Sequence, residues 1–493
     1  MGERSFVKGD HNSAHRSSRP RHSLWSFFGS RDRSKGSTRP RRSFVEPGFS
    51  DAGPGKLNHS WATGLDEAVK SKASAAHPLR LRIDVPLLLI VATLLVIGLL
   101  FVFSASWEYS FASQENEAAR EASLTGREAA LSGVSDPSLI LQRQIMFVLI
   151  GIAGATLLAF FDYHLLQKVA VFAILLTLAA LIAVLFVGDE RHGAVRTLFN
   201  GSIQPSELAK IVLIVYLAVW LYSKREYINK MSFGVLPLSL IVGIMGAFIY
   251  FQPDLSALVT VGLMGLLMFF LAGGEMKQIF LFGSLALVVG ALIVSASSTW
   301  NIRMTFFLSG LKDPAQASYH VQRSIEAFVK GGWFGVGIGR ATTKLTGLPV
   351  PHTDSIFAVI GEETGVVGAV VVVCLYGLLL WRGLVIARRA PDGLGSLLAA
   401  GLSIWLAIEA FVNMAVMVGL MPFAGNALPF ISAGGSNMVV SMAAVGFLFN
   451  VSRLSEETIQ KEERTFRAVV DLRRRDGRRG QSRTRRPSKQ NAD

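Results

Sequence analysis

Residues 85 to 105 read VPLLLIVATLLVIGLLFVFSA, a stretch that contains no charged side chain. A helix of about 20 such residues is long enough to cross the roughly 30 Å hydrocarbon core of a bilayer. Similar runs recur along the chain and predict an all-α membrane protein with about ten transmembrane helices. The predicted spans lie near 85–105, 142–161, 168–187, 206–222, 233–251, 254–273, 278–297, 355–381, 396–420 and 435–452.

The composition agrees with a polytopic membrane protein rather than with several soluble domains. Of the 493 residues, 51% are hydrophobic and 17% are charged, and the mean hydropathy is +0.42. These values are typical of integral membrane proteins. The single cysteine, Cys374, falls inside a predicted span, which excludes disulfides and cysteine-based metal sites within the chain.

Charge predicts the orientation, because Lys and Arg are enriched in loops that stay in the cytoplasm. Residues 1–83 carry sixteen Lys and Arg, and the chain after Arg453 is also basic. Ten spans place both termini in the cytoplasm. We therefore expect a disordered basic tail over 1–83, a membrane domain over 84–453 and a second basic tail over 454–493. Attraction to anionic membrane lipids explains the basic tails more simply than nucleic-acid binding does.

The large loop predicted over 298–353, between spans seven and eight, lies on the outer face and yet is basic. Two acids, Asp313 and Glu326, oppose six bases, so the loop carries a net charge of +4. Such a surface favours an anionic ligand, because Arg and Lys pair well with phosphate. The alternative is that these side chains are solvated or snorkel from interfacial helices. The six bases are Arg303, Lys312, Arg323, Lys330, Arg340 and Lys344. The glycine-rich run 331–339 in this loop predicts a tight backbone turn.

Residues 347–365, GLPVPHTDSIFAVIGEETG, place ionisable groups at the mouth of an apolar span. Charged groups at membrane depth are costly, so this segment is a candidate functional site. The groups are His352, Asp354, Glu362 and Glu363.

Two polar segments open other predicted spans. QPSELAK, residues 204–210, puts Glu207 and Lys210 three residues apart on one helical face. This pair forms either part of a site or a structural ion pair between helices. Pro205 suits a first helical turn, and Ser206 or a neighbour is expected to cap it. In QPD, residues 252–254, we expect Asp254 to cap the following helix.

LPFISAGGSN, residues 428–437, precedes the last predicted span. Gly434 and Gly435 permit a close backbone approach, and free N–H groups at a helix start bind anions. The alternative is an ordinary loop that caps the last helix. In the ninth span, Glu409 and Asn413 are expected to make hydrogen bonds between helices.

In order and spacing, these segments resemble the SEDS family of shape, elongation, division and sporulation proteins, represented by FtsW, RodA and SpoVE. The resemblance covers about residues 82–453 and also includes YHVQRSIEAFVKGGWFGVGIG at 319–339. The SIQPSELAK segment and the long N-terminal extension are more similar to the division protein FtsW than to RodA.

The resemblance implies a peptidoglycan glycosyltransferase that polymerises lipid II at the outer face of the bacterial cytoplasmic membrane. Asp354 matches the family's essential aspartate, with a proposed role as general base. Glu207, Lys210, Gln204 and Ser206 would support the site from a central cavity. No cofactor is certain, and a divalent cation such as Mg²⁺ or Mn²⁺ is the one candidate. Residues expected to bind substrate or diphosphate are Arg303, Lys330, Arg340, Lys344, His352, Ser432, Gly434, Gly435 and Ser436.

The implied partners are a class B penicillin-binding protein and other division proteins. Rival functions are a flippase for the lipid-linked precursor, an elongation polymerase and a non-catalytic scaffold. Some positions depart from the family pattern and bear on acceptor or partner contacts. They are His192, Thr197, Ser256, Ala257, His320, Arg323 and Ala433.

Overall fold

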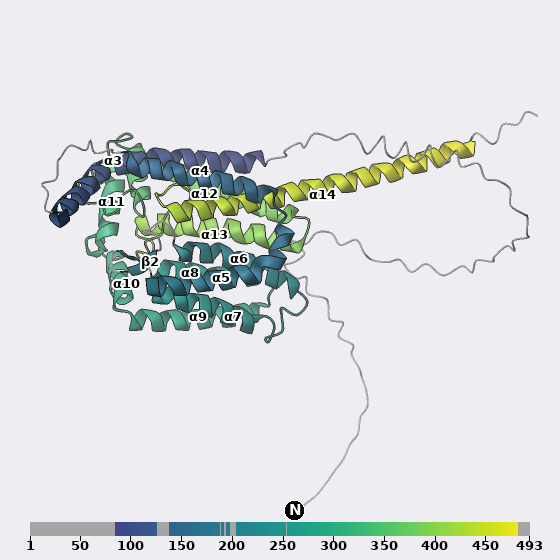
Figure 1. Cartoon of the computed structure of the whole chain (residues 1–493), viewed down its shortest axis with the longest axis horizontal. Helices are drawn as coiled ribbons and strands as arrows, with labels where there is room; N and C mark the ends of the chain where they lie inside the picture. Colours follow the sequence, from purple (N-terminus) through teal and green to yellow (C-terminus); the bar gives the residue numbers. More distant parts are fainter. Residues whose placement is uncertain are drawn as a thin grey trace, which may run out of the picture.

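A computed structural model describes residues 84–125, 138–187, 189–191, 194–197, 204–252 and 254–481. The N-terminal tail predicted over 1–83, residues 482–493 and His192 lie outside the described residues. The described chain is almost wholly helical and forms one bundle (Figure 1). The predicted all-α fold is therefore confirmed, apart from a two-stranded antiparallel ribbon of β1 (Asp189–Arg191) and β2 (Ala194–Thr197).

Each predicted span coincides with a helix of the bundle. Eight of these helices are long and apolar enough to cross a membrane, whereas α7 and α8 have 17 residues each. The protein is thus a multi-pass membrane protein, and the count of ten spans stays a prediction. The helices are α3 (Val85–Thr125), α4 (Leu139–Phe160), α5 (Leu166–Val187), α6 (Pro205–Ser223), α7 (Val235–Phe251), α8 (Leu255–Leu271), α9 (Met276–Ala296), α12 (Ile356–Arg389), α13 (Gly393–Met417) and α14 (Gly435–Gln481).

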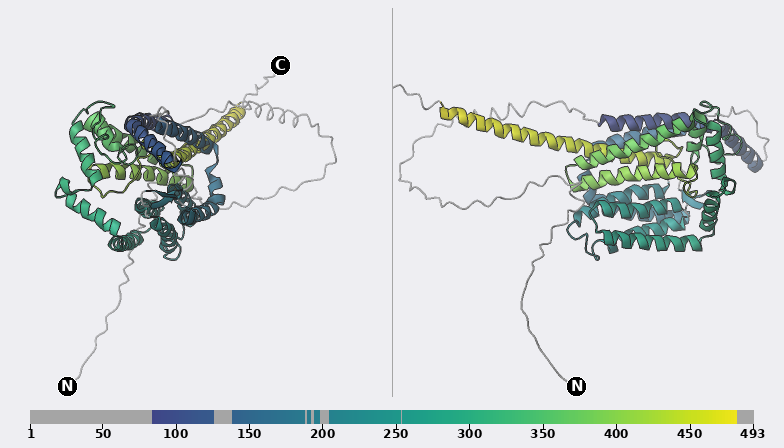
Figure 2. Two further views of the ribbon diagram at one scale, coloured as in Figure 1. Left: turned by 60° about the vertical axis from the view of Figure 1, so that its left-hand side comes forward. Right: turned by 180° about the vertical axis from the view of Figure 1, so that it is seen from behind.

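Two helices extend well beyond their predicted ends. Helix α3 continues to Thr125, past the end of the span predicted over 85–105, because residues 112–125 are rich in the strong helix formers Ala and Glu. Helix α14 continues to Gln481, through most of the basic tail predicted over 454–493. Figure 2 shows α14 projecting far beyond the bundle.

The helices at the centre of the bundle are α13 and α14. Within their spanning windows 72% of the residues are buried, against 11% in α9 at the periphery. Trp405 of α13 and Tyr376 of α12 are among the largest fully buried side chains. Polar groups on these central helices are therefore shielded from lipid by the surrounding helices.

One carboxylate joins three helices at the end of the bundle where α3 begins. Arg382 of α12 donates two hydrogen bonds to Asp84, of 2.9 and 2.8 Å, and Ser452 of α14 donates a third of 3.2 Å. The ion pair is largely buried and its geometry is bidentate, which fixes direction as well as distance. Asp84 thus ties together α12, α14 and the start of α3.

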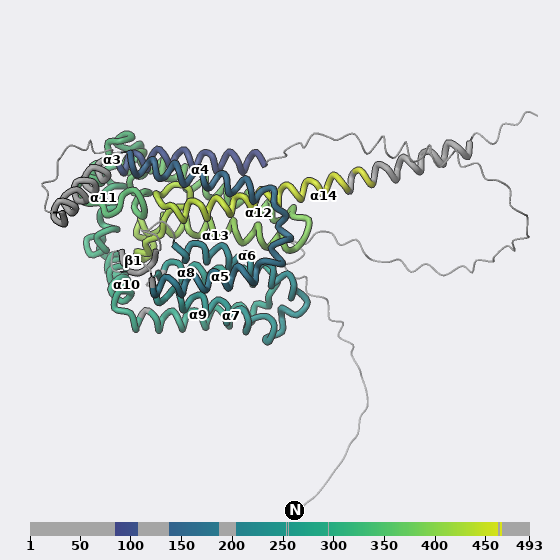
Figure 3. The backbone as a smooth tube through the Cα atoms, in the orientation of Figure 1, coloured from purple at the N-terminus to yellow at the C-terminus, as the bar shows by residue number. Residues whose placement is uncertain are grey.

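The loop predicted over 298–353 contains two helices, α10 (Ser298–Gly310) and α11 (Tyr319–Gly331), joined through a short 3₁₀ turn at Pro314–Gln316. Both run across the opposite end of the bundle instead of along it (Figure 3). The chain then returns through the glycine-rich run to α12, which begins beside the candidate site.

Candidate functional site

Three of the polar segments meet at the start of α6. The backbone N–H of Gln204 donates to Ser436, in the GGS segment formed by residues 434–436, at 2.9 Å. The Gln204 side-chain amide and the Ser206 hydroxyl both donate to Asp254, at 3.1 and 2.8 Å. Asp254 also accepts from the N–H of Ala257 and so caps α8 as predicted. Ser206 makes no cap for its own helix, and that expectation is wrong.

The predicted pair on α6 is part of a buried triad of charges. Lys210 lies 2.9 Å from Glu207 and also pairs with Glu409 of α13. Asn437 of α14 donates to Glu207 at 3.2 Å. A buried charge needs such partners, because removing one would leave its opposite uncompensated. The triad therefore fixes α6, α13 and α14 against one another.

The backbone around Asp354 is held from both sides. Ala433 donates its N–H to the His352 carbonyl at 2.8 Å, and the Ser432 hydroxyl donates to the Thr353 carbonyl at 2.6 Å. The Asn413 side chain donates to the Asp354 carbonyl at 2.9 Å. These bonds all involve backbone carbonyls and fix the backbone around Asp354. The Asp354 side chain itself is partly exposed.

The loop after α13 approaches the Asp354 carboxylate. At Gly425, with φ of 67°, an added Cβ would lie 3.3 Å from Asp354 Oδ2. The Asn413 side chain also donates to the Asn426 carbonyl and so holds this loop beside Asp354. These contacts were not predictable from local sequence, although Pro422, Gly425 and Asn426 are turn residues that mark a loop here.

Backbone strain is concentrated in the same two loops. Among the described residues, the only non-glycine residues with positive φ are Val350, at 45°, and Phe430, at 66°. For a β-branched side chain such as valine this conformation is a genuine outlier. Strained backbone of this kind clusters at functional sites, where the surrounding structure enforces it.

His352 is neutral at neutral pH. Its side chain is buried, and burial lowers its pKa to about 4 because the charged imidazolium loses its hydration. It therefore offers no positive charge to an anion near Asp354.

Glu362 and Glu363 do not join Asp354 at one site. Glu362 accepts hydrogen bonds from the Thr342 N–H at 2.8 Å and from the Thr343 side chain. Glu363 pairs with Lys344 at 2.8 Å and accepts from Ser104 of α3 at 2.6 Å. Both carboxylates are fully buried and bind the preceding loop to α12.

The predicted basic residues are spread over the end of the bundle that carries α10 and α11 rather than gathered in one cluster. Lys344 is neutralised by Glu363, and Lys330 pairs with Glu326 at 2.9 Å. Arg303 donates to the Phe423 carbonyl at 3.3 Å and lies over the Phe423 ring. Arg340 is exposed and forms no ion pair with any other described residue.

The polar groups of the GGS segment form hydrogen bonds with other parts of the protein. Gly434 donates its N–H to Gln144 of α4 at 3.3 Å, and α14 begins at Gly435. A Cβ at Gly435 would lie 2.6 Å from the Phe147 ring, so glycine permits α4 to approach closely. Within the described part of the chain, no group of three or more His, Cys, Asp or Glu residues could hold a metal ion.

The sequence profile of the cell cycle proteins FtsW, RodA and SpoVE matches residues 85–457. The chain belongs to the FtsW/RodA/SpoVE family. A probable peptidoglycan glycosyltransferase FtsW from Trichlorobacter lovleyi is 36% identical over 375 residues, which are 75% of this chain and 93% of the relative. The stage V sporulation protein E of Bacillus subtilis is 34% identical over 381 residues, 76% of this chain and 97% of the relative.

A solved structure agrees with this assignment. It is a chain from a study of the structural coordination of polymerization and crosslinking by a peptidoglycan synthase complex. The TM-score is 0.59 at 27% identity, over 76% of this chain and 98% of that chain. The bundle described above is therefore the fold of the FtsW/RodA/SpoVE family.

Several positions that depart from the usual FtsW/RodA/SpoVE pattern have defined contacts here. His320 stacks on Phe423, with ring centroids 4.1 Å apart, and Arg323 pairs with Glu326 and the Thr346 carbonyl. Burial and then the charge of Arg303 lower the pKa of His320. Ser256 donates to Asp254 at 3.0 Å. Ala257 and Ala433 contribute the N–H groups described above, and Thr197 lies in β2.

Proposed function

We propose that this chain is a peptidoglycan glycosyltransferase that polymerises lipid II into glycan strands during cell division. The FtsW relatives named as peptidoglycan glycosyltransferases support the activity. The observation that carries the proposal is Asp354, a partly exposed carboxylate whose flanking carbonyls are all held by hydrogen bonds. A fixed backbone suits a catalytic group, because small misplacements reduce the rate strongly.

In the proposed reaction, Asp354 acts as the general base. It takes the proton from the 4-hydroxyl of the acceptor GlcNAc while that oxygen attacks the anomeric carbon of the donor sugar. The new C–O bond forms as the bond to the lipid diphosphate breaks, and the anomeric configuration inverts. The electron pair leaves with the diphosphate, and the proton stays on Asp354 until solvent removes it. Proton transfer to a positioned carboxylate contributes about 10²- to 10⁴-fold to such a rate.

The leaving diphosphate requires positive charge. Arg340 is the best-placed candidate among the predicted bases, because it is exposed and has no ion-pair partner among the described residues. Arg303 and Lys330 would contribute after giving up weaker contacts. Because the described residues offer no three-ligand metal group, a divalent ion would need diphosphate oxygens as ligands.

The buried triad is proposed to support the site. Glu409 and Asn413 lie four residues apart, on one face of α13, so Lys210 and Asp354 are linked through that helix. His352, Ser432 and Ser436 connect the two site loops with α6.

We also propose a place and partners for the activity. The membrane is the bacterial cytoplasmic membrane, and the site faces outward. A class B penicillin-binding protein would cross-link the product, as the pairing of polymerization with crosslinking in the similar synthase complex supports. The FtsW relatives favour a role in division, with other division proteins and membrane lipids as further partners.

The test is polymerisation of purified lipid II by the full chain, reconstituted with a class B penicillin-binding protein. We expect Asp354→Asn to lower the rate by about 10²- to 10⁴-fold, because the amide cannot accept the proton. Asp313→Asn is the matched control, since Asp313 caps a 3₁₀ turn in the same loop region. Equal activity of wild type and Asp354→Asn would refute the assigned role. Lipid II transport across vesicles without polymer would favour a flippase.

A further inference from the structure

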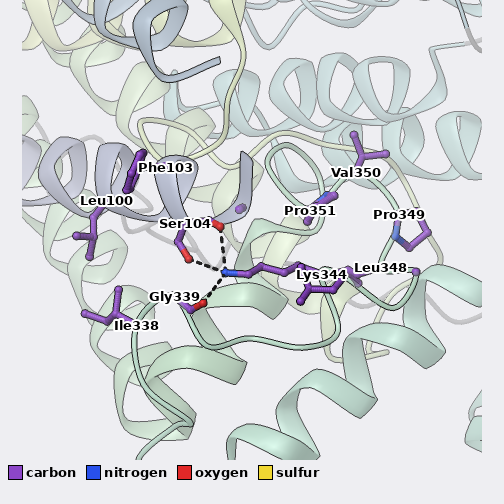
Figure 4. Close-up of a pocket in the computed structure, with 13 residues that line it drawn as sticks. Leu100, Phe103, Ser104, Ile338, Gly339, Lys344, Leu348, Pro349, Val350 and Pro351 are labelled. Atoms are coloured by element: carbon purple, nitrogen blue, oxygen red, sulfur yellow. Dashed lines mark hydrogen bonds between the residues drawn. The ribbon is translucent and has the colours of Figure 1, made fainter. Parts of the chain in front are cut away.

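An apolar cavity lies between helix α3 and the loop that leads to Asp354. Its volume is about 990 Å³. Figure 4 shows Leu100 and Phe103 of α3 on one side and Leu348 to Pro351 of the loop on the other. A cavity of this size and apolar character is typical of sites that enclose much of a ligand.

The lining of the cavity is partly exposed and mostly apolar. Leu100 and Phe103 are 42% and 40% exposed, and Ile338 across from them is 57% exposed. The one charged group inside is Lys344. Its ammonium has four acceptors within hydrogen-bond distance: Glu363, the Ser104 hydroxyl, the Ser104 carbonyl and the Gly339 carbonyl, at 2.8, 2.9, 3.0 and 3.3 Å. These bonds use the three donors of Lys344, so the interior suits an uncharged, apolar ligand segment.

One exposed cationic residue adjoins the lining residues in the sequence. Arg340 follows the lining residue Gly339, is exposed and pairs with no other described residue. The loop wall ends at Pro351, three residues before Asp354. An apolar interior, with an exposed arginine next to a lining residue and a candidate catalytic loop as one wall, suits a molecule with a long apolar chain and an anionic head.

We propose that this cavity binds the polyprenyl chain of the lipid-linked sugar substrate and so directs the attached diphosphate past Arg340 toward Asp354. The inference rests on the proposed function for its substrate. It adds a chain-binding subsite on α3, a helix that the predicted site residues did not include. Burial of chain carbons contributes roughly 0.8 kcal/mol for each CH₂ group, which makes chain length a sensitive probe of the subsite.

The first test fills the cavity in the reconstituted complex. We expect Leu100→Trp to raise KM for lipid II with an undecaprenyl chain by about tenfold and to leave kcat unchanged. KM for lipid II with a farnesyl chain should stay unchanged, because the short chain makes few contacts. Leu287→Trp is the control, since Leu287 is 73% exposed on α9, away from the cavity. An equal effect of Leu100→Trp on both substrates, or none, would overturn the proposal.

The second test needs no catalysis. A photoreactive undecaprenyl phosphate should label peptides 97–105 and 338–351 of the full chain, and Leu100→Trp should reduce that labelling. A photoreactive phosphatidylglycerol that labels the same peptides equally well would show that bilayer lipid fills the cavity and would overturn the proposal. If neither the wild type nor the variants make polymer but the labelling is as expected, the proposed function fails and the subsite stands.

Discussion

The side-chain amide of Asn413 joins the two loops that flank the candidate site. One NH₂ group serves the carbonyls of Asp354 and Asn426, and the residue is 2% exposed. Asn450 of α14 has the same chemistry far away, because its NH₂ group donates to the carbonyls of Leu158 and Ala159 and it is fully buried. The two residues form a matched pair that separates positioning from stability.

We predict that Asn413→Leu and Asn450→Leu lower the free energy of unfolding by similar amounts, about 2 kcal/mol, because each leaves buried carbonyls unpaired. Only Asn413→Leu should also lower kcat, by about tenfold or more, since Asp354 loses its anchor. Thermal unfolding in detergent and polymerisation kinetics measure the two effects. Equal kcat for both variants would contradict a positioning role for Asn413.

The second prediction at this scale concerns His352. Its pKa is about 4 in the folded chain and about 6.5 in the unfolded chain. The unfolded chain therefore binds more protons between these values, and stability falls as the pH is lowered through this window. At pH 5 the loss relative to pH 7 should be about 2 kcal/mol. His352→Gln should remove this component, which unfolding midpoints at the two pH values would reveal. An unchanged pH dependence would disagree with the buried, neutral histidine.

Single residues divide into those that the sequence could place and those that it could not. Glu207 and Lys210 were predictable, because helical spacing puts them on one face, and Asp254 was predictable as a cap. Their partners were not, since Glu409 lies 199 residues from Lys210. No local pattern contains a contact of that separation. Glu362 and Glu363 were grouped with Asp354 because they are near it in sequence, although they contact residues 342–344, earlier in the same loop.

Among the elements, α12 is interrupted where the glycine-rich loop docks against it. Gly365 has φ of 71° and breaks the helix. The loop fills the break with backbone hydrogen bonds in both directions. Val336 and Gly337 donate to the carbonyls of Glu362 and Glu363, at 3.0 and 3.1 Å, and Val366 donates to Gly332 at 2.9 Å. The groups freed by the break are satisfied by protein, as the membrane requires.

We predict that Gly365→Ala destabilises the protein by about 2 kcal/mol or more. The left-handed backbone is unfavourable for alanine, and its Cβ would overlap the backbone of Trp333 and Gly335. Gly377 of the same helix is the control, because an added Cβ meets nothing within 4 Å and alanine favours a helix. Gly377→Ala should raise the unfolding temperature or leave it unchanged. A harmless Gly365→Ala would contradict the break.

The sequence predicted the helices better than their interruptions. A bilayer demands about 20 apolar residues for each span, and that demand is readable from composition. The break in α12 is hidden, because a long apolar run follows Gly365 directly and glycine also occurs in unbroken membrane helices. The tight turn predicted for residues 331–339 is confirmed by four positive-φ glycines, but its docking partner was not foreseen.

For the whole molecule, the distribution of Lys and Arg predicts which end of the bundle faces the cytoplasm. The lone Cys374 allows a direct test. In Cys374→Ala, we predict that Lys312→Cys reacts with a membrane-impermeant maleimide added to intact spheroplasts. Lys224→Cys, at the other end of the bundle, should react only after permeabilisation. Both positions are exposed in the folded chain. Labelling of both in intact cells would contradict the predicted orientation.

Helix α14 has a mechanical consequence. It starts at Gly435, beside Gln204 and the site loops, and ends at Gln481 after 47 residues without interruption. At about 1.5 Å per residue it is a stiff rod of about 70 Å. We expect a tilt imposed on its far end to move Ser436 as well, because both ends belong to one uninterrupted helix. Helix α14 would then act as a lever between the part of the chain that projects beyond the bundle and the candidate site.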